Sequence, residues 1–174
     1  MNSQPVIKSA LERSVKALTL KPARGQRTYT NVATVDGGTV CRTVEHDQEI
    51  TIDVGPALGG EDVGPTPSTV LRAAFSSCIA IGIKLWASRE DVPIEKITVV
   101  LDTEVDARGL LGVCDRVTPG FGAITASIAV QSDADAADIE RVIEKSLRYS
   151  TLMEVFCNPQ SIKTSLTIAA PEAA

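Results

Sequence analysis

The sequence predicts an α+β fold in which two helices pack against antiparallel sheet. The first half of the chain holds short segments where apolar and polar residues alternate, as in half-buried strands. A stretch that is apolar almost all round follows, and then a helix with one apolar stripe, with strand-like runs between and after them. This order favours helices that are segregated on one side of the sheet. The 174 residues suit one domain or one protomer of an intertwined dimer.

Residues 1–25 are expected to form a helical arm ahead of the main domain, which spans residues 26–174. Apolar residues recur at helical spacing between Pro5 and Leu20, and Ser3 is available as the N-terminal cap. A Lys-Pro pair and a glycine then end the helix. A role of the arm in binding a partner is one hypothesis, although no motif in it identifies that partner.

Three strands are expected next, at residues 27–35, 39–44 and 49–54, in an antiparallel meander. Asp36-Gly37-Gly38 joins the first two, because its glycines supply the positive φ that a tight hairpin turn requires. Residues 55–67 are rich in glycine and proline, so they are expected to form a loop that leads into the long helix.

The long helix is expected over residues 68–89 and ends before Asp91-Val92-Pro93. It is apolar almost all round, which predicts a central position in the fold. The same composition raises the question of a membrane span. Arg72 and Lys84 lie within the apolar stretch and favour a buried helix of a soluble protein.

The second half of the chain is expected to alternate between strands and one more helix. Residues 94–105 and 124–131 have the pattern of strands and flank a turn-rich segment, residues 106–122. A helix over residues 135–148 has a single apolar stripe. A last strand is expected over residues 161–169, and the sequence VFCNPQSI before it is expected to be the turn that leads into it.

Composition excludes several classes of function. The net charge of −5 and the pI near 4.9 disfavour nucleic acid and anionic membrane as partners, since both attract clustered Lys and Arg. Aromatic residues make up only 3%, too few for a base-stacking platform. The N-terminus lacks the uninterrupted apolar run of a signal peptide, so a cytoplasmic location is expected. Neither a metal nor another cofactor is expected, because no C-x-x-C pair occurs and His46 is the single histidine.

Of the four cysteines, Cys78 draws attention because it lies in the long apolar helix. A free cysteine in such a helix is more often a small core side chain than a nucleophile. Cys41 and Cys114 fall in a strand and in the turn-rich segment and are expected to be incidental. His46 falls in the polar run TVEHDQE, an expected exposed hairpin tip, and is therefore a poor candidate for a catalytic partner.

The segment GPTPSTVLRAAFSSCIAIGIKLWA resembles the OsmC and organic hydroperoxide resistance family, where a helix-borne reactive cysteine follows a proline by eleven residues, as Cys78 follows Pro67. The resemblance continues through DARGLLG, PGFGAI and VFCNPQSI, and so covers the chain from about Thr28 to its end. It implies an OsmC-like fold with antiparallel sheets around two central helices. It also implies an intertwined homodimer with active sites at the subunit interface.

In the family's peroxidases, a thiolate held ready by an arginine and a glutamate attacks the O–O bond, and a second cysteine then closes a disulfide. Cys78 matches the attacking cysteine. The other positions differ: the resolving cysteine corresponds to Ser150, the glutamate to Ser68 and the arginine to Thr39. A serine cannot form a disulfide, so the resemblance implies that an external thiol must resolve the oxidised Cys78.

Other residues are candidates for the missing roles. Arg42, three residues beyond Thr39, is the candidate catalytic cation beside Cys78, and Arg72 is a second one on the long helix. Cys157 could resolve Cys78 only if their Cα atoms lay within about 7 Å. The candidate substrate-binding residues are Ser68, Ser150, Phe75 and Trp86, although Trp86 is explained more simply as core.

Two hypotheses of function follow. The first is a thiol-dependent redox protein that reduces organic hydroperoxides through Cys78 with an external thiol reductant. The alternative is a non-catalytic domain that binds a small hydrophobic ligand at the dimer interface. The expected partners are a second copy of the chain, an apolar peroxide or other apolar ligand, and the reducing thiol.

Overall fold

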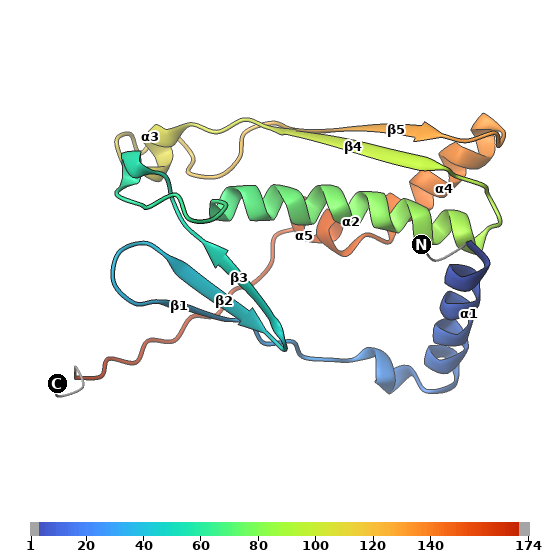
Figure 1. Ribbon diagram of the computed structural model, residues 1–174, viewed down its shortest axis with the longest axis horizontal. Helices are drawn as coiled ribbons and strands as arrows, with labels where there is room; N and C mark the ends of the chain where they lie inside the picture. The colour runs from blue at the N-terminus through green and yellow to red at the C-terminus, as the bar shows by residue number, and fades with distance from the viewer. Residues whose placement is uncertain (1–3, 171–174) are drawn as a thin grey trace.

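The computed structural model describes residues 4–170, in which two antiparallel sheets and a set of helices surround one long helix (Figure 1). The expected cap Ser3 lies outside the described residues. The helices are α1 (Gln4–Leu20), α2 (Pro67–Arg89), α3 (Ala107–Leu110), α4 (Ala136–Arg148) and α5 (Thr151–Cys157), with short 3-10 turns at Pro22–Gly25 and Pro56–Leu58. The strands are β1 (Val32–Val35), β2 (Cys41–Glu45), β3 (Gln48–Ile52), β4 (Lys96–Thr103) and β5 (Ile124–Gln131).

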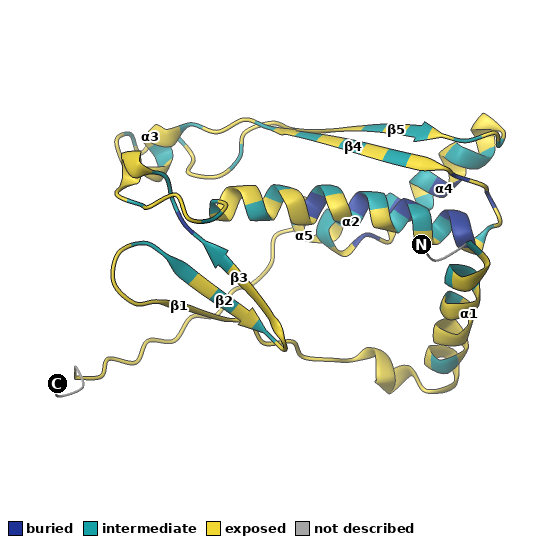
Figure 2. Ribbon diagram, viewed as in Figure 1, coloured by how far each residue is buried: buried dark blue, intermediate teal, exposed yellow. Residues whose placement is uncertain are grey.

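Helix α2 is the centre of the fold, as its all-round apolar pattern predicts. Thr66 caps it, because its side chain accepts a hydrogen bond from the backbone N–H of Thr69 at 3.2 Å, and Pro67 occupies its first turn. The face of α2 that packs on β4 and α4 carries the core, and Figure 2 shows the buried residues gathered there. The core residues are Phe75, Ile79, Ile83, Ala87, Val92, Ile94 and Val142.

The sheet β4–β5 covers one side of α2. Its two strands pair antiparallel from Lys96 opposite Gln131 to Thr103 opposite Ile124. Residues of β4 alternate between partly buried and exposed along the whole strand, so one face of the sheet contributes to the core. The strand predicted at residues 94–105 is confirmed with shorter ends, and the one predicted at residues 124–131 has the predicted bounds.

The sheet β1–β2–β3 is the predicted meander, and it packs mainly on itself. Gly37 and Gly38 take positive φ angles of 75° and 59° in the β1–β2 turn, and His46 forms the exposed tip between β2 and β3. Figure 1 shows this sheet standing apart from the layer formed by α2 and β4–β5. Its apolar side chains therefore stay uncovered within one chain: Val32, Val35, Val44 and Ile50 are all exposed.

The C-terminal region differs from the prediction. The segment expected to be a turn includes the end of helix α5, because Ser150 caps a helix that runs to Cys157. The strand expected over residues 161–169 is wrong for the single chain, since residues 158–170 belong to no helix or strand. Ile162, Leu166 and Ile168 keep the alternation of a strand but are 83%, 84% and 85% exposed. Alternation fixes which side chains share a face, whereas a strand also needs a neighbouring strand to pair with.

Helix α1 is attached to the C-terminal end of α2. The Gln4 side chain donates to the backbone carbonyls of Ala87 and Val92 at 3.5 and 3.2 Å, and Lys8 forms an ion pair with Asp91. The Ala87 carbonyl also accepts the backbone N–H of Val92 at 2.9 Å, so Gln4 joins a turn that already closes the end of α2. Helix α2 is long and apolar enough to cross a membrane by length and composition alone, a property shared with core helices. Its packing on β4, α4 and α1 is that of a core helix.

Candidate functional site

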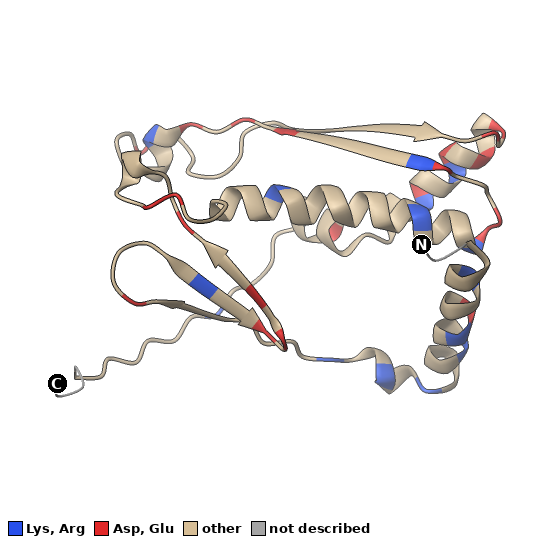
Figure 3. Ribbon diagram, viewed as in Figure 1, with Lys and Arg blue, Asp and Glu red and all other residues tan. Residues whose placement is uncertain are grey.

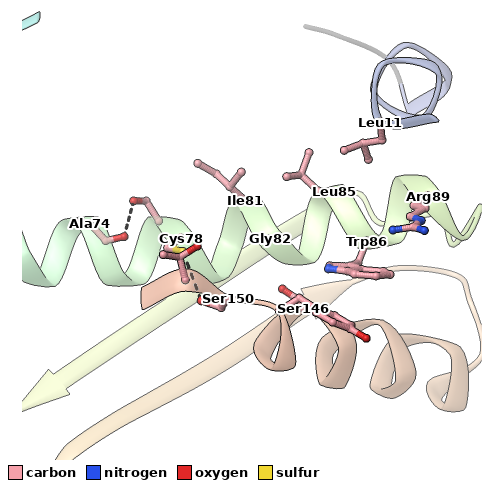
Figure 4. Close-up of a pocket in the computed structure, with 13 residues that line it drawn as sticks. Leu11, Ala74, Cys78, Ile81, Gly82, Leu85, Trp86, Arg89, Ser146 and Ser150 are labelled. Carbon is pink, nitrogen blue, oxygen red and sulfur yellow. Dashed lines mark hydrogen bonds between the residues drawn. The ribbon is translucent and has the colours of Figure 1, made fainter. Parts of the chain in front are cut away.

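A cavity of about 640 Å³ runs along α2, between α1 on one side and the α4–α5 junction on the other (Figure 4). Its lining is mostly apolar. Cys78, Gly82 and Leu85 lie on α2, one helical turn after another, and so share one face of the helix. Leu11 of α1 points toward Leu85 in Figure 4. We call this cavity, with the thirteen lining residues drawn in Figure 4, the α2 trough.

Cys78 lies at one end of the α2 trough, where its sulfur meets a hydroxyl. The distance from Cys78 Sγ to Ser150 Oγ is 3.5 Å, and Ser150 is itself buried. The Ser150 Oγ also accepts the backbone N–H of Met153 at 3.2 Å, because Ser150 caps α5. Since that bond uses only a lone pair of the oxygen, the hydroxyl proton remains able to point at the sulfur. The capping geometry of α5 therefore holds a hydroxyl donor against Cys78.

One turn further along α2, Gly82 faces Ser146 of α4. A Cβ atom on Gly82 would lie 2.7 Å from Ser146 Oγ, so the glycine allows the two helices to approach closely at this point. Ser146 is only 2% exposed, and within the described residues its hydroxyl has no hydrogen-bond partner. A buried hydroxyl without a partner is uncommon in a folded protein.

Aromatic rings and a cation form the other end of the α2 trough. Trp86 stacks on Tyr149 with ring centroids 5.2 Å apart, and the Arg89 guanidinium lies 4.8 Å from the Trp86 ring centre. Arg89 is the charged residue in the lining. Figure 3 shows how sparse charge is along α2 compared with α1 and α4.

The neighbouring cations are paired with carboxylates, since Arg141 also pairs with Asp138. Lys145 and Arg141 of α4 both pair with the carboxylate of Glu90, and these contacts, the one with Lys145 first, hold the pKa of Glu90 below its usual value. Within residues 4–170, by contrast, no carboxylate lies within ion-pair distance of Arg89. Arg89 therefore brings uncompensated positive charge to an otherwise apolar cavity.

The structure brings together three of the residues that the sequence analysis selected: Cys78, Ser150 and Trp86 all line the α2 trough. Phe75 does not line the trough, because it lies on a different face of α2. Its ring faces the core and stacks on Phe156, with centroids 4.4 Å apart.

The other selected residues lie away from the sulfur within one chain. Ser68 is exposed in the first turn of α2, ten residues and about 15 Å along the helix axis from Cys78. Arg42 lines a separate hollow beside β1 and β2. The Arg72 guanidinium donates to Thr69 Oγ1 at 3.2 Å. Cys157 lies at the exposed far end of α5, where its thiol contacts Met153 Sδ at 3.7 Å.

Thr39, which stands at the position of the family's arginine, has a structural contact. Its hydroxyl donates to the buried carboxylate of Asp53 at 2.7 Å, and the backbone N–H groups of Val54, Glu61 and Val63 donate to the same carboxylate. These bonds, the one from Thr39 first, lower the pKa of Asp53 to about 2. The carboxylate thereby anchors the loop that delivers the chain into α2.

Sequence reasoning selected three of the thirteen residues that line the α2 trough, and those it missed include Leu11, Ser146, Tyr149 and Arg89. A signal for one of them exists in the spacing, because Arg89 follows Cys78 by eleven residues, which brings both to the same face of α2. The contribution of Leu11 depends on how α1 docks, which no local pattern specifies.

Comparison with known proteins places these features in a family. The family model described as OsmC-like protein matches residues 59–165, which is more than half of the chain. No curated protein matches the chain significantly. An OsmC-like protein from Mycoplasma pneumoniae has a similar structure, with 14% identity and a TM-score of 0.66 over 77% of this chain and 90% of the other. An organic hydroperoxide resistance protein from Elizabethkingia anophelis, with thiocyanate bound, has 16% identity and a TM-score of 0.55 over 77% and 91%. At these identities the structural similarity shows the fold.

Proposed function

Because the chain belongs to the OsmC-like family, we propose that it is a thiol-dependent redox protein that reduces organic hydroperoxides through Cys78. One observation carries the proposal: the Cys78 sulfur lies in an apolar cavity with a hydroxyl 3.5 Å away. An apolar lining suits the organic part of a hydroperoxide. The name of the Elizabethkingia structure supports the same chemistry.

The reaction at the sulfur balances with a thiol as the reductant. The Cys78 thiolate attacks the terminal oxygen of R–O–O–H, a sulfur–oxygen bond forms, and the O–O bond breaks. The leaving alkoxide takes a proton and departs as the alcohol, while Cys78 becomes a sulfenic acid. An external thiol then forms a mixed disulfide with Cys78 and releases water. A second thiol reduces that disulfide and restores Cys78.

Ser150 has a defined place in this scheme. Its hydroxyl is positioned to donate to the thiolate, which favours the charged form of the sulfur in an apolar surround. It cannot act as a resolving group, since an oxygen forms no disulfide. Cys157 is seven residues further along, about 10 Å up the axis of α5. The external thiol therefore carries out both reducing steps.

We further propose that the protein acts as a homodimer. Strand-like residues 161–169 lack a strand to pair with, and the apolar faces of β1–β2–β3 and of α2 remain exposed, Ile81 at 59% among them. A second copy would cover these surfaces and close the open side of the α2 trough. The same arrangement would let Arg42 of the second copy supply the cation that Cys78 lacks within its own chain.

The test is the consumption of cumene hydroperoxide with dithiothreitol as the reductant. We expect turnover by the native protein, none by Cys78→Ser, and undiminished turnover by the matched variant Cys114→Ser. Dimedone should label Cys78 after peroxide treatment, because it traps sulfenic acids. Full activity of Cys78→Ser would disprove the proposal.

A second candidate function rests on one observation. Among the described residues, the hydrogen-bond partner of Cys78 Sγ is Ser150, and no cationic side chain contacts the sulfur. This is the environment of a binding domain that has kept the cavity without the catalysis. That alternative predicts slow reaction of Cys78 with peroxide at neutral pH in a protein that still binds apolar ligands. Rapid dimedone labelling would reject it.

A further inference from the structure

We propose that the outward face of α1 docks on an anionic phospholipid membrane, where four cations contact headgroup phosphates and a leucine between them enters the apolar boundary. This face surrounds a hollow of about 290 Å³ at the end of α1 and in the 3-10 turn that follows. We call it the arm patch, and its residues are Arg13, Lys16, Ala17, Leu20, Lys21 and Arg24. The proposal goes beyond the reaction at Cys78 and does not depend on it.

The first argument is the distribution of charge along the chain. Residues 1–27 hold six of the 17 Lys and Arg residues but only one of the 22 Asp and Glu residues, so their formal net charge is +5 and that of residues 28–174 is −10. The average of −5 disfavours an anionic membrane, but it conceals this division. Because physiological salt screens charges over about 8 Å, the local sign decides what an exposed segment attracts. Figure 3 shows the positive charges gathered on α1 and on the turn after it.

The second argument is that the cations of the arm patch are unpaired. Within residues 4–170, no carboxylate lies within ion-pair distance of its four Lys and Arg side chains. The single carboxylate of α1, Glu12, lines a different hollow together with Lys8 and Asp91, which pair with each other. The positive charge of the arm patch is therefore free to attract an external anion.

The third argument is that helix phase points the arm patch away from the rest of the molecule. Leu11 faces the α2 trough, and Leu20 follows it by nine residues, which is two and a half turns at about 3.6 residues per turn. Leu20 therefore lies on the opposite side of α1. Arg13 and Lys16 precede it by seven and four residues and share its face. A flat, extended partner can reach this face without displacing the contacts that hold α1 on α2.

The apolar centre of the arm patch favours a membrane over other polyanions. Leu20 is 72% exposed and lies among the cations, with Ala17 beside it. A leucine in this setting suits the boundary between headgroups and acyl chains, where it leaves water while the cations stay at the phosphates. A nucleic acid offers phosphates but no apolar phase, and the arm patch contains no aromatic residue on which a base could stack.

The experiment is the flotation of the full-length protein with phospholipid vesicles. One set consists of phosphatidylcholine with about 30 mol% phosphatidylglycerol, and the reference set is phosphatidylcholine alone, both in about 0.1 M salt. We expect the protein to float with the anionic vesicles and to stay behind with the neutral ones. Raising the salt to about 0.5 M should release it, because the attraction of exposed charges is screened.

Variants separate the effect of charge from that of the leucine. The double variant Arg13→Gln/Lys16→Gln should bind anionic vesicles about twentyfold more weakly, since each cation beside such a surface contributes about fivefold. Leu20→Ser should weaken binding several-fold with no change in charge. The matched control is Lys96→Gln/Arg116→Gln, which removes the same charge from exposed positions outside the arm patch. It should bind almost as tightly as the native protein.

Equal binding to the two kinds of vesicle, no binding to either, or native binding by the Arg13/Lys16 variant or by Leu20→Ser would each overturn the proposal. Tighter binding to a DNA duplex than to anionic vesicles would also overturn it and make nucleic acid the partner. The three variants should consume cumene hydroperoxide at the native rate, because none of them alters the α2 trough. Failure of membrane docking therefore leaves the proposed function intact, and an unreactive Cys78 leaves membrane docking intact.

Discussion

Replacing Ser150 with cysteine should convert this chain into a protein with an internal disulfide. Ser150 Oγ lies 3.5 Å from Cys78 Sγ, and small rotations about the two side chains can bring two sulfurs at these positions to the bonding distance of about 2.05 Å. The two positions are 72 residues apart in sequence, so the bond would close a long loop. The sequence resemblance gives residue 150 the same role, because it corresponds to the family's resolving cysteine.

The size of the effect follows from chain entropy and from the helix cap. Closing a loop of this length restricts the unfolded chain by about 4 kcal/mol. Ser150→Cys also removes the side chain that caps α5 through Met153, a loss of about 1 kcal/mol. The oxidised variant should therefore gain about 3 kcal/mol over the native protein, and the reduced variant should lose about 1 kcal/mol. For a domain of this size, the Tm of the oxidised variant should lie about 6–12 °C above that of the native protein, and the Tm of the reduced variant about 2–4 °C below it.

Thiol counting and thermal unfolding test this prediction. The native chain has four thiols, so the variant has five, and treatment with diamide or one equivalent of peroxide should leave three. Thr151→Cys is the matched control, because residue 151 also lines the trough but makes no contact with the Cys78 sulfur. It should keep all five thiols after one equivalent of diamide. If Ser150→Cys retained five thiols as well, the pairing of residues 78 and 150 would be refuted.

Three further predictions concern stability and the cavity wall. Gly82→Ala should lower the free energy of unfolding by about 1–3 kcal/mol, because the added Cβ clashes with Ser146 Oγ. In a double-mutant cycle measured by urea unfolding, Ser146→Ala should remove that penalty. An unchanged stability of Gly82→Ala would show that the helices readjust without cost. The pKa of Asp53 is lowered to about 2, so the ionised carboxylate stabilises the fold fully above about pH 4, and this effect is lost as the pH falls toward 2. The difference in unfolding free energy between the native protein and Asp53→Asn should therefore vanish over that range. A difference that stays constant with pH would contradict the assignment. Leu11→Ala should weaken binding of dodecan-1-ol several-fold in a titration followed by Trp86 fluorescence, whereas Leu20→Ala, at the exposed end of α1, should not.

Much of the fold could be predicted because its signals are local. Proline and threonine before α2, the glycines of the first hairpin and the apolar stripe of α4 each specify a structure through nearby residues. The last strand failed for a physical reason of a different kind. Alternation at residues 162–168 is real, but pairing depends on a neighbour that the single chain does not provide. The helix α5 was missed because its signal is one capping serine in a short segment.

The site was predictable where helix periodicity or the family resemblance applies. Trp86 follows Cys78 by eight residues and so could be placed near it, and Ser150 was selected by resemblance. Arg89 was missed although it lies on the same helix, because a terminal arginine ordinarily indicates only solvent exposure. In the part of the chain that the structure describes, the nearby Lys145 and Arg141 pair with Glu90, whereas the exposed Arg89 pairs with no carboxylate. Such a difference between neighbouring cations depends on tertiary contacts.

The sequence resemblance gives Ser150 the position of the family's resolving cysteine, which implies that one position keeps its structure and changes its chemistry. Ser150 caps α5, and its Oγ lies 3.5 Å from the Cys78 sulfur. What is lost is the capacity to store the oxidised state as a disulfide within the chain. Under the proposed function, an oxidised Cys78 therefore needs an external thiol, because residue 150 offers no second sulfur.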